Sequence, residues 1–368
     1  MQRVRIRELG ITIGEFETGE QNAITDVPGV LVGHTTLISG EGPLAPGEGP
    51  VRTGVTLVLP HAGNLFLQKV PAAVHTINGF GKVCGFEQVR ELGALEAPIA
   101  LTNTLNVGLV LDALIGEMIR QNPELGITEG TVNVVVGETN DGYLNDLQGR
   151  HVRREHVVQA LRRATGGPVE EGNVGAGTGT ICLGWKGGIG ASSRVLPAQS
   201  GGFTLGALVQ TNFGGAHSLV ISGVPLGRLL AHPDEAQPQR KDHGSVMVIL
   251  ATDAPLDSRQ LRRLCVRAEA GLARTGGWYD HGSGDFVIAF STANRIEHRA
   301  AALLTQRTAL ADERSVMHSL FQAVVESVEE AVLNSLSMAD TLAGRDGHIA
   351  YGLPLDETRK WLQRGYPV

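Results

Sequence analysis

The chain has 368 residues, of which 42% are hydrophobic and 19% charged, so it can bury a sizeable core. Its 38 acidic and 31 basic side chains give a net charge of −7, which argues against a general binder of the nucleic-acid backbone. Every apolar stretch is interrupted well before the roughly 20 residues of a membrane span, so no membrane role is expected.

Metal and disulfide chemistry are not expected either. The three cysteines, Cys84, Cys182 and Cys265, lie far apart and lack CxxC spacing, and the sequence has no HExxH motif. We therefore expect no metal and no cofactor. The basic start of the chain is not followed by an apolar segment of secretory type, which predicts a cytoplasmic protein.

Taken in chain order, strands and helices alternate irregularly. Short β-branched runs predict strands over residues 24–32, 54–59, 98–103, 132–137, 202–210, 245–252 and 285–290. Apolar residues at helical spacing predict helices over residues 107–121, 153–164, 258–274, 316–336 and 356–364. Without an internal repeat or a long linker, residues 1–368 are predicted to form one layered α/β domain with sheets inside and helices outside.

One polar segment interrupts this pattern. Residues 231–244 contain two prolines and lead directly into the apolar strand that begins at Ser245. An ordinary surface loop explains the segment. A Gly-Ser junction between such a loop and a buried strand is also what cleavage of the chain by its own serine would need.

The chemistry of that cleavage follows from the two residues. The Ser245 hydroxyl would attack the Gly244 carbonyl, and hydrolysis of the resulting ester would leave Ser245 with a free α-amine. Because an α-amine has a pKa of about 7.7 to 8.0, it could act as the general base for its own hydroxyl. Gly-Ser is a common dipeptide, so the junction alone does not predict the mechanism.

A resemblance to a known family supplies the stronger signal. It is carried by the blocks 137–146, 172–180, 186–194, 209–214, 242–245 and 282–286. In this order they resemble the DmpA family, which comprises L-aminopeptidase/D-esterase enzymes and the related β-peptidyl aminopeptidases. The match runs from about Ile24 to residues 344–347, which is nearly the whole chain.

The resemblance implies an α/β fold of four layers, an α-β-β-α sandwich of the N-terminal-nucleophile type shared with ornithine acetyltransferase. It also implies self-cleavage after Gly244 into residues 1–244 and 245–368, which stay associated. Ser245 matches the nucleophile of the family. The expected assembly is a homo-oligomer of cleaved protomers, with a tetramer favoured.

The resemblance also assigns the oxyanion and proton-transfer residues. Asn212 matches an asparagine whose amide helps to hold the oxyanion. Ser283 and Asp285 match a serine and an acidic residue that relay or orient protons beside the nucleophile. Asp285 is one methylene shorter than the glutamate found in some relatives. A turn-forming role for residues 282–285 is the structural alternative.

For substrate binding, Glu138 matches the carboxylate that pairs with the ammonium group of a peptide, amide or ester. A structural salt bridge is the alternative. Asn140 is a candidate second oxyanion donor, a role that Tyr143 could fill instead. His243 is a candidate to assist self-cleavage. The resemblance leaves the preference among L-, D- and β-amino acids open.

Three other functions compete with this hypothesis. The glycine-rich segments 175–179 and 187–190 superficially resemble phosphate-binding loops, but they lack a Walker lysine and the full GxGxxG spacing. An acyltransferase of the ornithine-acetyltransferase type would use threonine in place of Ser245. The third alternative is a binding protein that kept the fold and lost catalysis.

Overall fold

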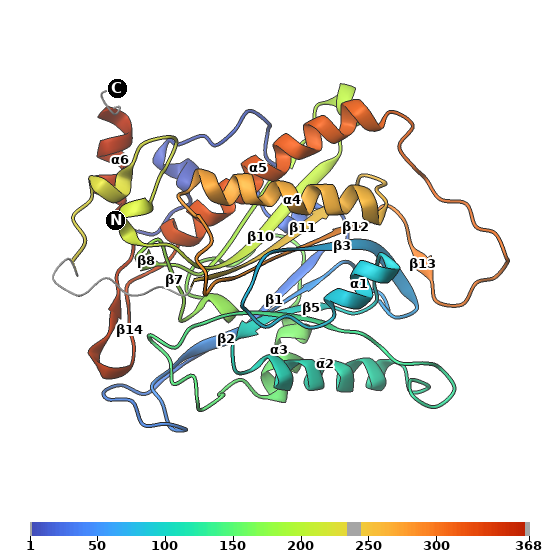
Figure 1. Ribbon diagram of the computed structural model, residues 1–368, viewed down its shortest axis with the longest axis horizontal. Coiled ribbons are helices and arrows are strands. Elements are labelled where there is room, and N and C mark those ends of the chain that lie inside the picture. Colours follow the sequence, from blue (N-terminus) through green and yellow to red (C-terminus); the bar gives the residue numbers. More distant parts are fainter. Residues whose placement is uncertain (1, 234–243, 365–368) are drawn as a thin grey trace.

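Two β-sheets face each other at the centre of the molecule, and helices cover their outer faces (Figure 1). The computed structural model describes residues 2–233 and 244–364. The larger sheet has the order β13-β3-β12-β11-β10-β9, with β4 beside β3. Its strands are β3 (Gln68–Gly79), β4 (Ala94–Leu95), β9 (Ile189–Val195), β10 (Thr204–Asn212), β11 (Ser245–Thr252), β12 (Gly284–Ser291) and β13 (Ile296–Glu297).

The smaller sheet has the order β1-β2-β5-β6. Its strands are β1 (Leu31–Ser39), β2 (Val51–Leu59), β5 (Ile99–Asn103) and β6 (Val135–Thr139). Two short hairpins lie apart from the sheets, β7 (Ile181–Cys182) with β8 (Trp185–Lys186), and β14 (Leu342–Ala343) with β15 (Ile349–Ala350).

Six α-helices occur among the described residues. They are α1 (Phe86–Leu92), α2 (Val107–Gln121), α3 (Arg154–Arg163), α4 (Ser258–Arg274), α5 (Glu313–Ser337) and α6 (Leu355–Arg364). Short 3-10 helices span Ile6–Leu9, Ile24–Asp26, Gly175–Gly177, Ala198–Ser200, Ala216–Ser218, Leu226–Arg228 and Arg345–Gly347. Helices α4 and α5 cover the larger sheet, and α2 and α3 cover the smaller one (Figure 1).

Three apolar clusters correspond to the three interfaces between these layers. Strand β11 shows why, because its side chains alternate between the two faces of the sheet. Val246 and Val248 pack with residues of α4 and α5, whereas Met247 and Ile249 join the cluster between the sheets. A third cluster lies between the smaller sheet and α2 and α3. The predicted four-layer α-β-β-α sandwich is confirmed.

Several predicted boundaries were wrong. Ile24–Asp26 is a 3-10 helix, and the strand begins only at Leu31. The intervening turn contains Gly29 at a φ of 92°, a conformation that glycine adopts without strain. Strand β6 begins at Val135 and continues to Thr139, so Glu138 lies inside the strand and not after its end.

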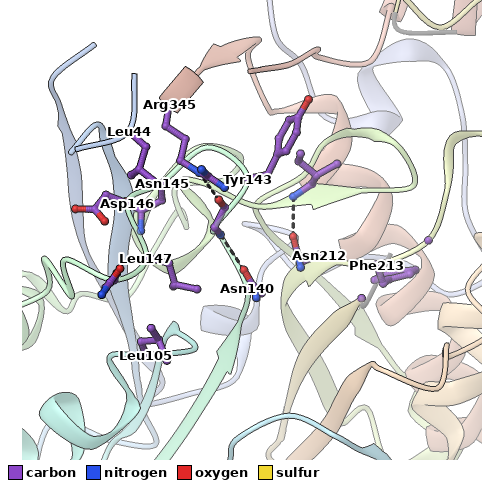
Figure 2. Close-up of a pocket in the computed structure, with 15 residues that line it drawn as sticks. Leu44, Leu105, Asn140, Tyr143, Asn145, Asp146, Leu147, Asn212, Phe213 and Arg345 are labelled. Atoms are coloured by element: carbon purple, nitrogen blue, oxygen red, sulfur yellow. Dashed lines mark hydrogen bonds between the residues drawn. The ribbon is translucent and has the colours of Figure 1, made fainter. Parts of the chain in front are cut away.

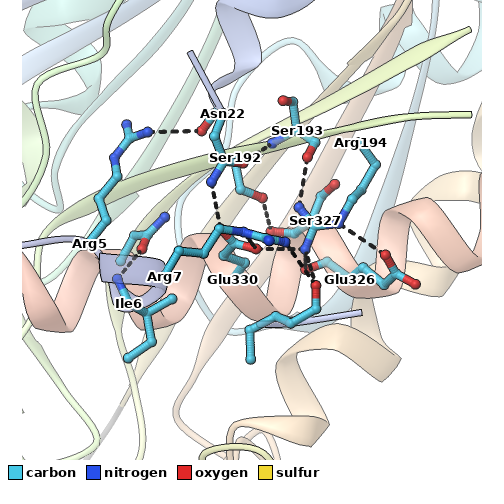
Figure 3. A network of polar contacts seen from close by, with 12 residues as sticks. Arg5, Ile6, Arg7, Asn22, Ser192, Ser193, Arg194, Glu326, Ser327 and Glu330 are labelled. Carbon is cyan, nitrogen blue, oxygen red and sulfur yellow. Dashed lines mark hydrogen bonds and ion pairs between the residues drawn. The ribbon is translucent and has the colours of Figure 1, made fainter. Parts of the chain in front are cut away.

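A buried polar network joins the amino-terminal segment to α5 (Figure 3). The Arg194 guanidinium donates from Nε to Glu326 Oε2 at 3.0 Å and from Nη2 to Glu330 Oε2 at 2.7 Å. Arg7 donates to both oxygens of Glu330, and Asn22 donates to Oε1. The Arg194 and Glu330 side chains are 0% exposed. The network therefore connects residues that precede Ser245 with residues that follow it.

No helix within residues 2–233 and 244–364 has both the length and the apolar character needed to cross a bilayer.

Candidate active site

Ser245 is the first residue of β11, in the middle of the larger sheet. It is paired with Asn212 of β10 on one side and with Gly284 of β12 on the other. Its hydroxyl donates to the Gly244 carbonyl oxygen at 2.6 Å, and the residue is 6% exposed. The hydroxyl therefore lies against the peptide group that self-cleavage would break.

The Gly244 carbonyl has a second donor. The backbone N–H of Gly284 donates to Gly244 O at 3.2 Å and lies 3.4 Å from Ser245 Oγ. Attack on this carbonyl would place negative charge on its oxygen, where the Gly284 N–H already points. Gly284 is a functional candidate that sequence reasoning did not assign, because the group involved belongs to the backbone.

Close packing explains why residue 244 is glycine. Its φ lies outside the left-handed region, but a Cβ there would lie 3.0 Å from Phe213 Cα and 3.1 Å from Phe213 Cβ. Close packing against the end of β10, and not a left-handed backbone, therefore favours glycine before Ser245.

The Asn212 amide is held by the β7–β8 hairpin. The Ile181 N–H donates to Asn212 Oδ1 at 3.0 Å, which leaves Nδ2 as the end of the amide that can donate to a ligand. Because Asn212 and Ser245 are direct partners on neighbouring strands, the donor and the nucleophile share one edge of the site. Ile181 is a second functional candidate that its residue type does not reveal.

Ser283 and Asp285 form a buried pair at the start of β12. Ser283 Oγ donates to Asp285 Oδ1 at 2.6 Å, and the two residues are 1% and 0% exposed. Burial raises the pKa of Asp285 to about 6, although the Ser283 hydrogen bond opposes that shift. The pair flanks Gly284, so both residues lie beside the strand that begins with Ser245.

Glu138 is buried in β6 of the smaller sheet. Its carboxylate accepts hydrogen bonds from Thr104 Oγ1 and, at 2.9 Å, from the Lys82 N–H. Burial raises the pKa of Glu138, and these hydrogen bonds oppose the shift. No ion pair to Glu138 occurs within the part of the chain that the structure describes. The expected alternative, a structural salt bridge, is thus absent from these residues.

The segment around Gly81 lies between Glu138 and the start of β12, the strand that pairs with Ser245. A Cβ at Gly81 would lie 2.8 Å from Gly284 Cα and 3.1 Å from Glu138 Oε1. The neighbouring Phe80 N–H donates to the Ser283 carbonyl at 3.2 Å. The two sheets therefore bring Glu138 close to the strand end that carries Ser283 and pairs with Ser245.

A cavity of about 760 Å³ opens beside these residues (Figure 2). Gly244, Asn212 and Phe213 border it on one side, and Asn140 and Tyr143 border it from the segment after β6. Its volume falls in the range of small-molecule sites, roughly 300–1,000 Å³. Ser245 itself does not line this cavity, and neither do Glu138, Ser283 and Asp285.

Glu138 instead lies near a second cavity. Its hydrogen-bond partners Lys82 and Thr104 line a space of about 640 Å³, and Leu105 lines both spaces. Leu105 therefore lies between the two cavities.

Asn140 and Tyr143 both border the first cavity, so each can act on a ligand there. Asn140 Oδ1 accepts from the Gly142 N–H at 2.8 Å, which directs its Nδ2 as the remaining donor. The Tyr143 ring stacks on His348 with a centroid separation of 4.2 Å and an interplanar angle of 4°. His243, the candidate to assist self-cleavage, lies outside the described residues.

The two glycine-rich segments pack against neighbouring strands. A Cβ at Gly54 would lie 2.3 Å from Gly175 O, and one at Gly188 would lie 2.0 Å from Gly172 O. These approaches bring backbone against backbone, which only glycine permits. Packing thus accounts for the segments that resembled phosphate-binding loops.

The comparison with known proteins agrees with this geometry. Residues 22–350 match the sequence model of peptidase family S58. The chain belongs to peptidase family S58. It is 41% identical over 379 residues to the beta-peptidyl aminopeptidase BapA of Sphingosinicella xenopeptidilytica, covering 99% of this chain and 92% of that relative.

Solved structures of related proteins support the same S58 assignment. A protein of Pyrococcus horikoshii OT3 is 49% identical, with a TM-score of 0.93 and coverage of 98% of this chain and 99% of that one. The L-aminopeptidase D-Ala-esterase/amidase of Ochrobactrum anthropi, described as a prototype serine aminopeptidase with a variant of the Ntn hydrolase fold, is 38% identical, with a TM-score of 0.88 and coverage of 98% of each chain. The predicted family, fold and hydrolase class are confirmed, and the acyltransferase alternative is not favoured.

Proposed function

We propose that this S58 peptidase cuts itself between Gly244 and Ser245 and then uses Ser245 to release amino-terminal residues from short peptides, amides or esters. The observation that carries the proposal is the contact of Ser245 Oγ with the Gly244 carbonyl oxygen at 2.6 Å. The serine is thus next to the bond that must break.

In the first reaction, Ser245 Oγ attacks the Gly244 carbonyl carbon while the Gly284 N–H stabilises the oxyanion. The C–N bond breaks, the amide nitrogen takes up a proton and becomes the α-amine of Ser245, and Gly244 is left as an ester on Oγ. Water then hydrolyses that ester. The products are a Gly244 carboxylate and a serine with a free amine and a free hydroxyl, in chains of residues 1–244 and 245–368.

In the second reaction, the same hydroxyl attacks a substrate carbonyl. The Ser245 amine accepts the hydroxyl proton, and the Asn212 amide stabilises the oxyanion. Departure of the amine or alcohol leaves an acyl-enzyme, which water resolves. The hydrogen bond from Ile181 to Asn212 Oδ1 supports this role because it directs Nδ2 as the donor.

Glu138 binds the substrate ammonium in this proposal. A buried carboxylate with hydrogen bonds from Lys82 and Thr104 but no ion-pair partner among the described residues favours a ligand that brings a cation. An internal peptide bond brings none, which explains exopeptidase action. The names of the relatives include both a beta-peptidyl aminopeptidase and an L-aminopeptidase D-Ala-esterase/amidase. L-, D- and β-amino acids therefore belong in one substrate panel.

The Ser283–Asp285 pair orients protons around the Ser245 amine, since Gly284 between them is paired directly with Ser245. Asn140 or Tyr143 supplies a second oxyanion donor from the cavity wall. Comparing Asn140→Ala with Tyr143→Phe separates these two residues, because only loss of the true donor lowers kcat.

The two chains stay associated, and the cleaved protomers form a homo-oligomer, with a tetramer favoured. The buried contacts of Arg194 with Glu326 and Glu330 support the first statement, since they join residues on both sides of the cut. A cytoplasmic location fits the three free cysteines, Cys84, Cys182 and Cys265.

The test is intact-mass analysis of protein purified without added protease, alongside Ser245→Ala. We expect two fragments that meet between Gly244 and Ser245, absent in the variant, and hydrolysis of at least one aminoacyl p-nitroanilide by the cleaved form only. A wild-type chain that stays at 38.9 kDa after prolonged incubation would contradict the proposal and favour a non-catalytic relative.

A further inference from the structure

The cavity of about 760 Å³ has an arginine in its wall. Arg345 lies at the tip of the β14–β15 hairpin and borders the cavity that Gly244 and Asn212 also border. The hairpin brings Arg345 from the carboxyl-terminal part of the chain to a wall built mainly by residues before Ser245. Figure 2 shows the Arg345 side chain directed from the hairpin toward the region of Asn140.

The guanidinium is held in place at one edge. Its Nε donates to the Gly142 carbonyl at 2.7 Å, and the Gly142 N–H donates to Asn140 Oδ1 at 2.8 Å. The hairpin is docked further by His348, whose ring stacks on Tyr143 and whose Nδ1 lies 2.8 Å from the Tyr143 carbonyl oxygen. Arg345 is therefore tied to the segment after β6, which borders the same cavity.

The other edge of the Arg345 guanidinium has N–H groups that can still donate to a ligand. Nη1 donates to Asp346 Oδ2 at 2.9 Å, and Nη2 has no hydrogen-bond partner among the described residues. The Arg345 side chain is 26% exposed, so it remains accessible from the cavity. A planar pair of N–H groups is the geometry that binds a carboxylate with two hydrogen bonds.

The acidic residue that borders the same cavity does not cancel this charge. Asp146 has a side chain that is 1% exposed, and its oxygens accept from His151 and from the N–H groups of Gly47 and Gly149. Although burial alone would raise its pKa, these hydrogen bonds lower it, so Asp146 is an anion turned toward its own donors. Arg345 is thus more accessible to a ligand than Asp146, and its ion pair with Asp346 offsets only part of its charge because Nη2 is not engaged by Asp346.

We propose that Arg345 binds the terminal carboxylate of the substrate, so that the preferred substrates are di- or tripeptides that end inside the cavity. This inference rests on the proposed function. Glu138 holds the ammonium at one end of the substrate, Ser245 attacks between the ends, and Arg345 holds the carboxylate of the leaving portion. Both termini of a short zwitterionic peptide are then recognised, and a carboxamide or a longer chain loses one of the two contacts.

The experiment compares kcat/KM for two matched pairs, β-alanyl-alanine with its carboxamide and L-alanyl-alanine with its carboxamide. The accepted pair should show a preference for the free carboxylate of about 10-fold or more at low ionic strength, as expected of a charge-assisted, two-point hydrogen bond. In Arg345→Gln the ratio should fall toward 1, and in Arg345→Lys it should fall only partly. In 0.5 M NaCl the wild-type ratio should shrink.

Two further variants sharpen the result. Asp346→Asn removes the carboxylate that competes for Nη1 and should raise the ratio; Asp346 has a φ of 57°, which asparagine tolerates. Arg120→Gln is the matched control, since that side chain is 73% exposed on α2 and outside the cavity, and it should keep the wild-type ratio.

A wild-type ratio near 1, or an active Arg345→Gln with an unchanged ratio, would overturn the inference while the hydrolase remains. Failure of the cleaved wild type to hydrolyse any peptide, carboxamide or p-nitroanilide would instead overturn the proposed function. If Arg345→Gln is not cleaved into two chains, the wild-type ratio, its salt dependence and Arg345→Lys decide the question.

Discussion

Two buried polar regions of this molecule contain carboxylates. In only one of them do described residues form ion pairs with those carboxylates. Around Arg194, the side chains of Glu326 and Glu330 are ion-paired and almost fully buried (Figure 3). Around Ser245, Glu138 and Asp285 are equally buried, yet no described residue forms an ion pair with either. The groups that donate hydrogen bonds to them are neutral, Thr104 Oγ1 and the Lys82 N–H for Glu138 and Ser283 Oγ for Asp285.

The difference separates two uses of a buried charge. In the network, the carboxylate oxygens of Glu326 and Glu330 accept hydrogen bonds from residues far away in the sequence, so the charges hold segments together. At the site, burial raises the pKa of both Glu138 and Asp285, and it outweighs the hydrogen bonds to both and the more distant charge of Lys82 on Glu138. In the proposed function, each of these carboxylates meets its cation only later, the substrate ammonium for Glu138 and the new amine of Ser245 for Asp285.

The largest effect should come from breaking the network. Arg194→Met leaves Glu326 and Glu330 without their shared partner and should lower the free energy of unfolding by about 3–5 kcal/mol. Urea unfolding in a Ser245→Ala background, where one chain unfolds, measures this value. The exposed control Arg120→Gln should change it by less than about 0.5 kcal/mol. Equal losses in the two variants would mean that the network does not stabilise the fold.

Next in size is the loss of the oxyanion donor. Asn212→Ala should lower kcat by about 100- to 1,000-fold, because the amide acts on charge that develops in the transition state. Steady-state kinetics of the cleaved protein measures this. Its unfolding free energy should fall by only about 1 kcal/mol, from the lost hydrogen bond of Ile181. A change confined to KM would remove Asn212 from the oxyanion site.

Removing the charge of Glu138 should have a smaller effect on turnover. Glu138→Gln should lower kcat/KM by about 10- to 100-fold, since a neutral amide cannot pair with the substrate ammonium. The sharper measurement is a cycle with a substrate that lacks the amine. Loss of the amine should impair the wild type strongly and the variant little, and additive losses would separate Glu138 from ammonium binding.

The smallest effect concerns Asp285 and the pH. Because burial raises its pKa to about 6, the stability associated with the neutral carboxyl is complete below its ordinary pKa of about 3.9 and is lost as the pH rises through 6. Asp285→Asn should therefore be more stable than its parent by about 1–2 kcal/mol at pH 8. The two should unfold alike at pH 4. Unfolding curves of Ser245→Ala with and without this change test the prediction at both pH values.

Helices and strands with a clear periodicity or a β-branched run could be predicted from the sequence alone. Helices α2 and α4 have the predicted bounds, and α4 begins with Asp257 accepting a hydrogen bond from the Gln260 N–H. Strands β11 and β12 follow from their β-branched runs. In contrast, β3 contains Pro71, and β9 buries Ser192, Ser193 and Arg194, so neither resembles an apolar strand. Strand β9 forms because it pairs with β10 and packs against α5.

Prediction of the site from the sequence was limited in the same way, because some of its groups are brought together only by the fold. Ser245, Asn212 and Glu138 were predicted from residue identity within the family resemblance. The Gly284 N–H and the Ile181 N–H were not, because a backbone group has the same chemistry in any residue except proline and acquires a role only through strand register. Arg345 joins the cavity only when a hairpin folds across to Gly142, a contact between residues 203 positions apart.

The strand order of the larger sheet makes the proposed cleavage a one-way event. Strands β12 and β11 follow Ser245, and they lie between β3 and β10, which precede it. As one chain, the molecule folds with its halves tethered. After the cut, two separated polypeptides would have to meet and interleave before a sheet could form again, so denaturation would not be followed by ready recovery. The lifetime of the active protein would then depend on its rate of unfolding. Only the uncleaved precursor would fold efficiently.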